Sequence, residues 1–289
     1  MRPFGISDRI ERPRNADLGA ALRRNPASLF GAVVVVVLTT IAVVGPIVVG
    51  DPNAGELSQR LQPPSAAHPL GTDPLGRDVL TRLVYGARVS LFMAVAITTV
   101  RLCLGFAVGL TAGLFGGLVD EGLMRLVDFL LAFPGIVLAL VIAGILGPSL
   151  TNALIALAIV GWGSYARVVR GSVLAVREEP FVDAAKLAGV SRTRLVVTHF
   201  IPNVSGPVIV LATLNLGGVL LAAAGLSFLG LGAQPPTPEW GTMLSGGTDY
   251  LRQAPWLVNA PGVAIAAAVL GFNLLGDGLR DALDTEVGR

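Results

Sequence analysis

Charged residues are scarce in this chain of 289 residues: Asp, Glu, Lys and Arg make up 14% of it, while hydrophobic residues make up 53%. Soluble globular domains carry about 25% charged residues. The shortage excludes an intrinsically disordered chain and an ordinary soluble enzyme. The composition favours a membrane protein that crosses the bilayer several times, because lipid then surrounds most of its surface.

Cysteine and lysine are almost absent, and each absence excludes a class of site. Cys103 is the only cysteine, so an intrachain disulfide and a cysteine-cluster metal site are excluded. Lys186 is the only lysine, and it lies between Ala185 and Leu187. A P-loop needs its lysine within Gly-Lys-Ser or Gly-Lys-Thr to hold nucleotide phosphates. This chain therefore has no standard P-loop, and its net charge of +2 is too small to indicate nucleic acid as a partner.

Histidine is also rare, and no group of residues has metal-ligand spacing. We expect His68 to occupy a turn before Pro69, and His199 to pack at the base of a cytoplasmic loop. Ser227 lacks the Gly-x-Ser-x-Gly spacing of a nucleophile elbow. The sequence therefore predicts neither a metal site nor a catalytic residue.

Long apolar stretches define the fold class. A spanning helix needs about 20 mostly apolar residues. Five stretches qualify, and the third of them, 129–166, is too long for one span. Gly147-Pro148-Ser149 divides it into two, so an all-α membrane protein with six transmembrane helices is predicted. The first stretch could instead be a signal peptide, but about 28 residues precede its core, and we interpret it as an uncleaved helix. The stretches are 25–50, 89–119 (interrupted by Arg101), 129–166, 199–238 and 253–276.

The basic residues are unevenly distributed between the two sides. Fifteen Arg and Lys residues lie on the side of the termini, and five lie on the other side. The positive-inside rule then places both termini in the cytoplasm. The predicted organisation is a cytoplasmic segment 1–28, a first transmembrane helix 29–50, an extracytoplasmic segment 51–88, a core of five helices 89–281 and a tail 282–289. The core includes a polar cytoplasmic segment 168–202 and an outer loop 233–252.

The cytoplasmic segment 168–202 has the pattern of two short helices. Pro180 suits a first helical position, Gly189 suits a helix stop, and Ser191 can cap a second helix that ends near Pro202. Such a pair would protrude and allow another protein to approach its backbone closely. An amphipathic loop lying on the membrane surface is the alternative. The small side chains that permit the close approach are Ala184, Ala185 and Ala188.

This segment resembles the EAA loop of permease subunits of bacterial ABC importers. That pattern is Glu-Ala-Ala, three residues, Gly, nine residues, an aliphatic residue, one residue, Leu and Pro. Asp stands here for Glu, His199 for the aliphatic residue and Ile201 for Leu. The matching positions are Asp183, Ala184, Ala185, Gly189 and Pro202.

Three further stretches resemble the dipeptide, oligopeptide and nickel branch of these permeases, in particular its second, "C"-type, subunit. They are His-Pro-Leu-Gly-Thr-Asp at 68–73 with its continuation to 88, the glycine-rich 225–241, and 272–281. The resemblance extends over roughly residues 20 to 284. It implies the type I ABC importer permease fold.

The resemblance also implies partners and a mechanism. A second permease, two cytoplasmic ATPase subunits and an extracytoplasmic substrate-binding protein are expected in the bacterial inner membrane system. ATP and Mg would be bound by the ATPase subunits, and this chain would bind no cofactor. The substrates would be di- or oligopeptides, with nickel or haem-like chelates as the alternative. The residues expected to couple to the ATPase are Asp183, Ala184, Ala185, Lys186, Gly189 and Pro202.

Two other sets of residues are candidates for contact with the binding protein and the substrate. Trp240, Gln234 and Pro236 would contact the binding protein, or their loop would only cap the helix ends. Arg101 lies midway along the second span, where a charged side chain is costly in lipid. It would therefore face the translocation path, pair with a buried partner such as Asp128, or extend its charged group to the membrane interface.

Two other classes of protein compete with this interpretation. An ion-coupled secondary transporter would call for carboxylates within the spans, and none of the six predicted spans has a central Asp or Glu. An intramembrane enzyme would need catalytic His, Asp or Ser at membrane depth. The sequence therefore favours the membrane subunit of an ATP-driven importer.

Overall fold

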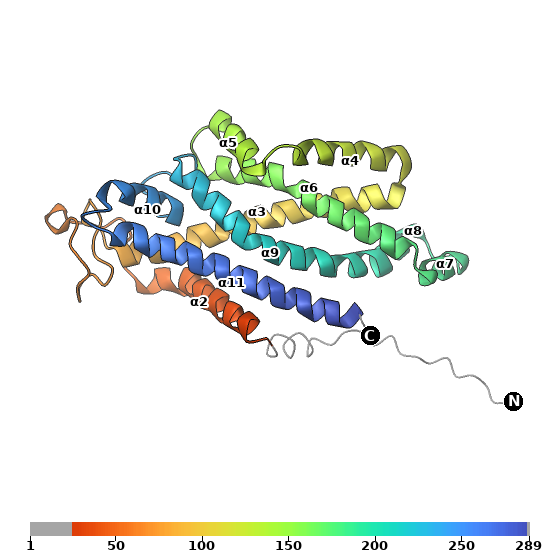
Figure 1. Ribbon diagram of the computed structural model, residues 1–289, viewed down its shortest axis with the longest axis horizontal. Coiled ribbons are helices and arrows are strands. Elements are labelled where there is room, and N and C mark those ends of the chain that lie inside the picture. Colours follow the sequence, from red (N-terminus) through yellow and green to blue (C-terminus); the bar gives the residue numbers. More distant parts are fainter. Residues whose placement is uncertain (1–24, 288–289) are drawn as a thin grey trace.

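The computed structural model describes residues 25–287, with side chains to 282, and over that range the regular structure is helical. Most of the predicted cytoplasmic segment 1–28 lies outside the described residues. The six arginines counted in that segment all lie outside them. Long helices run roughly side by side, with shorter helices along one side of them and others toward the two ends (Figure 1). The helices are α2 (Pro26–Val48), α3 (Val79–Phe115), α4 (Gly117–Leu131), α5 (Gly135–Leu146), α6 (Leu150–Arg177), α7 (Pro180–Leu187), α8 (Arg192–Leu195), α9 (Ile201–Phe228), α10 (Trp240–Gly247) and α11 (Trp256–Val287).

Helices α3, α6 and α9 form the centre of the bundle (Figure 1). α3 approaches α6 through glycines spaced four apart, which lie on one face of the helix. A Cβ atom on Gly109 would lie 2.7 Å from Cβ of Val169, and one on Gly113 would lie 2.6 Å from Cγ1 of Val173. The absence of side chains at these positions therefore sets how closely α3 and α6 pack.

Helix α3 begins at Val79, ten residues before the predicted start of the second span. The side chain of Asp78 caps it by accepting a hydrogen bond from Thr81 N at 2.7 Å. The predicted stretch begins later because it was counted from the first residue after the charged Arg88. Charge limits the membrane-embedded part of a helix but not its helical continuation into the polar region.

The predicted third span is not a straight helix. α4 and α5 meet at an angle of 86°. The described chain has five helices that are long and apolar enough to cross a membrane, and the count rises to six if the bent α4–α5 pair is taken as one span. Pro134 directly precedes α5, where its ring is compatible with a helix start but not with a continuous helix from α4. The prediction missed the bend because it read the apolar run 129–146 by length alone.

Two further boundaries differ from the sequence prediction. α6 continues to Arg177, so the first ten residues of the predicted coupling segment 168–202 belong to a long helix. α11 passes residue 281 without a break and ends at Val287, so no separate tail begins at 282. Both helices carry charged residues in their terminal turns, where a hydropathy criterion stops too early.

The two ends of the bundle differ in structure. α7 and α8 lie at one end, and the segment 51–78 lies with α10 at the other (Figure 1). α2 packs against α11, where a Cβ atom on Gly271 would lie 2.9 Å from Cγ1 of Val34. The candidate sites predicted from sequence therefore fall at opposite ends of one helical framework.

Candidate functional site at the α7–α8 tip

The α7–α8 tip, residues 178–195, has the local structure that its sequence predicts. Pro180 is the first residue of α7, and Gly189 follows the helix with a φ angle of +76°. This backbone conformation is in the left-handed region that glycine adopts without steric cost. Ser191 caps α8 by accepting a hydrogen bond from Arg194 N at 3.4 Å.

The end of the second short helix was predicted wrongly. The sequence placed it near Pro202, whereas α8 passes through one π-helical turn, 196–200, directly into α9. Pro202 is the second residue of α9 and follows directly on the π-helical turn. The tip is therefore continuous with α9 on one side and joined to α6 by a two-residue turn on the other.

One face of the tip is buried against the ends of α6 and α9. Val182 is fully buried, and Leu195 and Phe200 are 7% and 3% exposed. Their neighbours in the same apolar cluster include Val173 and Val204. Close-packed side chains transmit displacement, so a force on the tip reaches both long helices.

His199 lies at the base of the tip, as predicted. Its ring is 5.5 Å from the ring of Phe181, measured between centroids. This contact joins α7 to the π-helical turn before α9. It adds to the apolar packing that fixes the tip on the bundle.

The opposite face of the tip is exposed. Leu187 is 90% exposed, and Asp183, Ala184 and Lys186 are exposed beside it. Lys186 Nζ lies 2.9 Å from Asp183 Oδ1, but both side chains are more than half exposed, so the pair contributes little to stability. Ala185 is half-buried and packs against the apolar cluster instead.

Helix α4 is attached to α6 by two ion pairs. Arg170 forms a two-pronged contact with Asp120, in which Nη2 lies 2.6 Å from Oδ2. Arg167 lies 2.7 Å from Asp128. The first pair is 32% and 17% exposed at its two side chains, and the second is 58% and 65% exposed. The more buried pair is therefore the stronger connection between the two helices.

Arg101 lies between α3 and α6 in the middle of the bundle. Its Nε and Nη2 both donate to the carbonyl oxygen of Leu157, at 2.9 and 2.7 Å. The side chain covers Gly161, where a Cβ atom would overlap the guanidinium group. Asp128 pairs with Arg167, so the predicted alternative in which Asp128 neutralises Arg101 was wrong.

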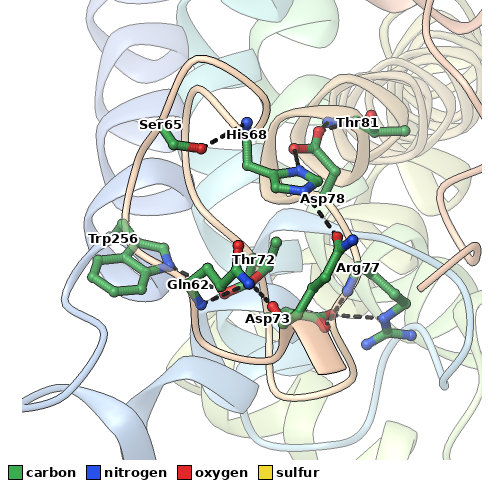
Figure 2. A network of polar contacts seen from close by, with 10 residues as sticks. Gln62, Ser65, His68, Thr72, Asp73, Arg77, Asp78, Thr81 and Trp256 are labelled. Atoms are coloured by element: carbon green, nitrogen blue, oxygen red, sulfur yellow. Dashed lines mark hydrogen bonds and ion pairs between the residues drawn. The ribbon is translucent and has the colours of Figure 1, made fainter. Parts of the chain in front are cut away.

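At the other end of the bundle, the segment 51–78 folds around a polar network (Figure 2). Asp73 accepts hydrogen bonds from the backbone N–H groups of Leu75 and Arg77, and its Oδ2 lies 2.6 Å from Arg77 Nε. His68 bridges Asp78 and Gln59, at 3.0 Å to each. His68 thus joins two parts of this segment instead of serving only as a turn residue.

Trp240 was expected to be exposed, and it is buried. It is 1% exposed, and its indole N–H donates to the carbonyl oxygen of Leu83 at 3.0 Å. The preceding Glu239 is equally buried and accepts a hydrogen bond from Ser90 Oγ at 2.9 Å. These contacts attach α10 to α3, which favours the predicted alternative of a cap over the helix ends. Gln234 and Pro236 are exposed, as a contact with another protein requires.

Known proteins resemble this chain over most of its length. The family model described as "Binding-protein-dependent transport system inner membrane component" matches residues 105–289. The model described as "N-terminal TM domain of oligopeptide transport permease C" matches residues 17–64. The chain belongs to the family of binding-protein-dependent inner membrane transport components. It is a permease subunit of an ABC transporter, a transport component and not a catalytic one.

Curated relatives of the permease carry related names. The "Dipeptide transport system permease protein DppC" of Alkalihalophilus pseudofirmus is 47% identical over 267 residues, which are 92% of this chain and 88% of the relative. The "Probable D,D-dipeptide transport system permease protein DdpC" of Escherichia coli is 41% identical, with 92% and 90% covered. The "Nickel transport system permease protein NikC" of the same species is 44% identical, with 81% and 84% covered.

The fold of the permease also has a solved counterpart. A chain of the structure described as "Inward facing conformations of the MetNI methionine ABC transporter: CY5 native crystal form" matches with a TM-score of 0.56 and 18% identity. The match covers 70% of this permease and 97% of that chain. The two chains therefore share a fold, and the family assignment rests on the sequence relatives.

The sequence interpretation of the permease missed Leu187. A detectable signal was its angular position on α7: successive helical residues turn by 100°, so Leu187 lies about 140° from the buried Val182. A leucine that far from the buried face of a polar tip has no intramolecular partner to cover it. Asp120 was missed, and Asp128 was assigned to Arg101 instead of Arg167, because no local pattern connects the two aspartates with arginines some 40 to 50 residues later.

Proposed function

We propose that this permease forms, with a second permease, the translocation path for di- or oligopeptides in an ATP-driven importer. A separate binding protein would deliver the peptide, and two ATPase subunits would supply the energy. The exposed face of the α7–α8 tip is the observation that carries this proposal. Its support is a 90% exposed Leu187 on an element that packing fixes to both α6 and α9.

The tip has the features of a protein-docking element. Large apolar side chains that insert into a partner's pocket are typical centres of binding energy. We infer that Leu187 enters a groove of an ATPase subunit, with Asp183, Ala184 and Lys186 around it. Gly189 and Pro202 would act indirectly, by fixing the turn and the start of α9, and Ala185 by packing the tip on the bundle. ATP and Mg would then be bound by the partner, since this chain has no Gly-Lys-Ser/Thr sequence.

The proposed orientation places the tip and both termini in the cytoplasm. The excess of basic residues on that side supports it, with fifteen against five. The type I importer permease fold is supported by the shared fold with the methionine transporter chain. The end with α10 and segment 51–78 would then face outwards, and Gln234 and Pro236 would be available to the binding protein.

Peptides are the proposed substrates because several relatives over most of the chain are named for dipeptide transport. Import of a nickel chelate is the second candidate, and the 44% identical nickel permease favours it. Purifying the complete complex with its binding protein and identifying the bound ligand by mass spectrometry separates the two. A bound nickel chelate and no peptide would contradict peptide import.

The docking proposal is tested by replacing Leu187. We expect Leu187→Glu to reduce substrate-stimulated ATP hydrolysis and uptake in proteoliposomes by at least about tenfold, because a buried unpaired carboxylate opposes docking. Leu187→Met keeps an apolar side chain of similar size and should retain most activity. Unchanged transport by the Leu187→Glu complex would contradict docking through this face.

Arg101 remains a predicted residue of the translocation path. Its guanidinium group has one nitrogen, Nη1, that makes no hydrogen bond within the described chain, while the other two are held by Leu157. A substrate carboxylate that passed along this part of α3 could bind there. Substitution by alanine should then alter the substrate profile, whereas a purely structural arginine would change stability alone.

A further inference from the structure

A cavity of about 400 Å³ lies at the end of the bundle formed by segment 51–78 and α10. Its volume is within the range of small-molecule sites. It lies between the start of α3, the end of α9 and the inner side of α10. Its lining includes Asp73, Arg77, Arg82, Ser227, Met243 and Gly246.

The charged residues of this cavity are not balanced. Among the described residues that line it, one carboxylate, Asp73, faces two guanidinium groups. Asp73 Oδ2 lies 2.6 Å from Arg77 Nε and 3.7 Å from Arg82 Nε. Asp73 and Arg82 are only 6% and 7% exposed. The side chain of Arg77 is 16% exposed, so the positive charge in excess lies in a partly desolvated site, where an anion would stabilise it.

The hydrogen bonds of the two arginines leave donors free to bind such an anion. Asp73 is committed to Arg77 and to two backbone N–H groups (Figure 2). Arg82 uses Nη1 for the carbonyl oxygen of Pro52, at 3.0 Å, and for Asn53 Oδ1, at 3.3 Å. No described residue accepts a hydrogen bond from Nη1 or Nη2 of Arg77, or from Nη2 of Arg82. Guanidinium nitrogens with free donors are well suited to carboxylates.

We propose that this cavity binds the carboxylate of an incoming peptide, through Arg77 and Arg82, as the peptide leaves the binding protein. The inference rests on the proposed function, because it takes a peptide as the substrate and this end of the bundle as the outer end. The two arginines bind the carboxylate, and α10 covers the cavity. The permease thereby has a first site of its own for the substrate.

The experiment uses the complete permease–ATPase complex in nanodiscs without binding protein. Binding of L-alanyl-L-alanine and of its C-terminal amide is measured by saturation-transfer NMR. We expect the amide to bind at least about tenfold more weakly, because it lacks the charge that pairs with the guanidinium groups. Arg77→Gln should cause a similar loss for the dipeptide and little change for the amide.

A second pair of variants separates binding from folding. Gly246 lies on the wall of the cavity and no atom lies within 4 Å of a Cβ atom there, so Gly246→Phe adds a large side chain at this wall without a clash at Cβ. Gly50 lies outside the cavity with equally open surroundings, so Gly50→Phe is the matched control. Loss of dipeptide binding in Gly246→Phe but not in Gly50→Phe is expected.

Three results would overturn the inference. They are no dipeptide binding to the wild-type complex, equal binding of the amide, and full binding in Gly246→Phe. If the dipeptide does not bind but Arg77→Gln weakens capture of the binding protein, the carboxylate belongs to that protein. Uptake of the dipeptide with binding protein present is measured in parallel. Uptake without binding in the cavity rejects this inference alone, and absence of any peptide uptake rejects the proposed function.

Discussion

Two apolar residues show which properties of single positions can be deduced from sequence. Trp240 follows a proline-rich stretch, which suggests exposure, yet it is 1% exposed. It packs against Gly86 of α3, and its indole N–H donates to the carbonyl oxygen of Leu83. Leucine is a residue type that is usually buried in the core, yet Leu187 is 90% exposed. Exposure depends on contacts with distant elements, whereas the position of Gly189 depends only on local backbone geometry and was correctly predicted.

Gly189 allows a prediction about backbone conformation. Its φ angle of +76° strains a β-branched residue, and nothing lies within 4 Å of a Cβ atom there. Gly189→Val should destabilise the turn by about 1 to 2 kcal/mol and lower coupled ATP hydrolysis. Gly189→Asn is the control, because asparagine tolerates the left-handed region and should keep most activity. If both variants lose coupling equally, the effect comes from side-chain bulk at the docking surface.

Arg101 and Gly161 should be energetically coupled. Gly161→Ala forces the guanidinium group away from the Leu157 carbonyl oxygen, so we expect a loss of about 1 to 3 kcal/mol of stability. In an Arg101→Met background the same substitution should cost much less, because the flexible thioether can move aside. A double-mutant cycle on the detergent-solubilised complex measures the difference. Additive effects would show that the two residues do not share this space.

At the scale of helices, sequence predicts which segments are apolar but not how they bend or continue. The runs of hydrophobic residues gave the position of α2 closely, and they gave the starts of α9 and α11 within three residues. They missed the 86° angle between α4 and α5 and the extension of α6 to Arg177. Bending depends on which neighbours cover the break, and helix extension beyond the bilayer depends on polar contacts such as the ion pairs with α4. Neither is recorded in local hydropathy.

The ion pair between Asp120 and Arg170 should contribute to coupling, because α6 leads directly to the tip. Asp120→Arg removes a partly buried ion pair, so the free energy of unfolding should fall by about 1 to 2 kcal/mol. Much of the coupled ATPase activity should be lost as well. Combining it with Arg170→Asp should restore a substantial part of that activity. The matched control is Asp128→Arg with its more exposed partner Arg167, where the expected effect is smaller. Equal effects of the two substitutions would mean that the charge change at α4, and not this pair, matters.

At the scale of the whole molecule, the fold joins two distant ends for which different partners are proposed. The tip is packed on α6 and α9, and the cavity lies between the start of α3, the end of α9 and α10. α9 runs from the base of the tip to the wall of the cavity, since Ile201 begins it and Ser227 lies in its last turn. A displacement of the tip therefore reaches the cavity through one continuous helix. This helix is long and apolar enough to cross a membrane, and the proposed function requires its two ends to be on opposite sides.

That requirement gives a direct test of orientation. Cys103 is the only cysteine, so Cys103→Ser gives a background without thiols in which single cysteines can be placed. In cells whose outer layers are made permeable while the inner membrane stays sealed, a membrane-impermeant maleimide should label Gln234→Cys. The same reagent should leave Thr193→Cys unlabelled. In inside-out vesicles the pattern should reverse. Both positions are exposed, so a difference between them reports sidedness and not burial. Labelling of both from the same side would contradict the proposed orientation and, with it, docking of the α7–α8 tip on a cytoplasmic ATPase.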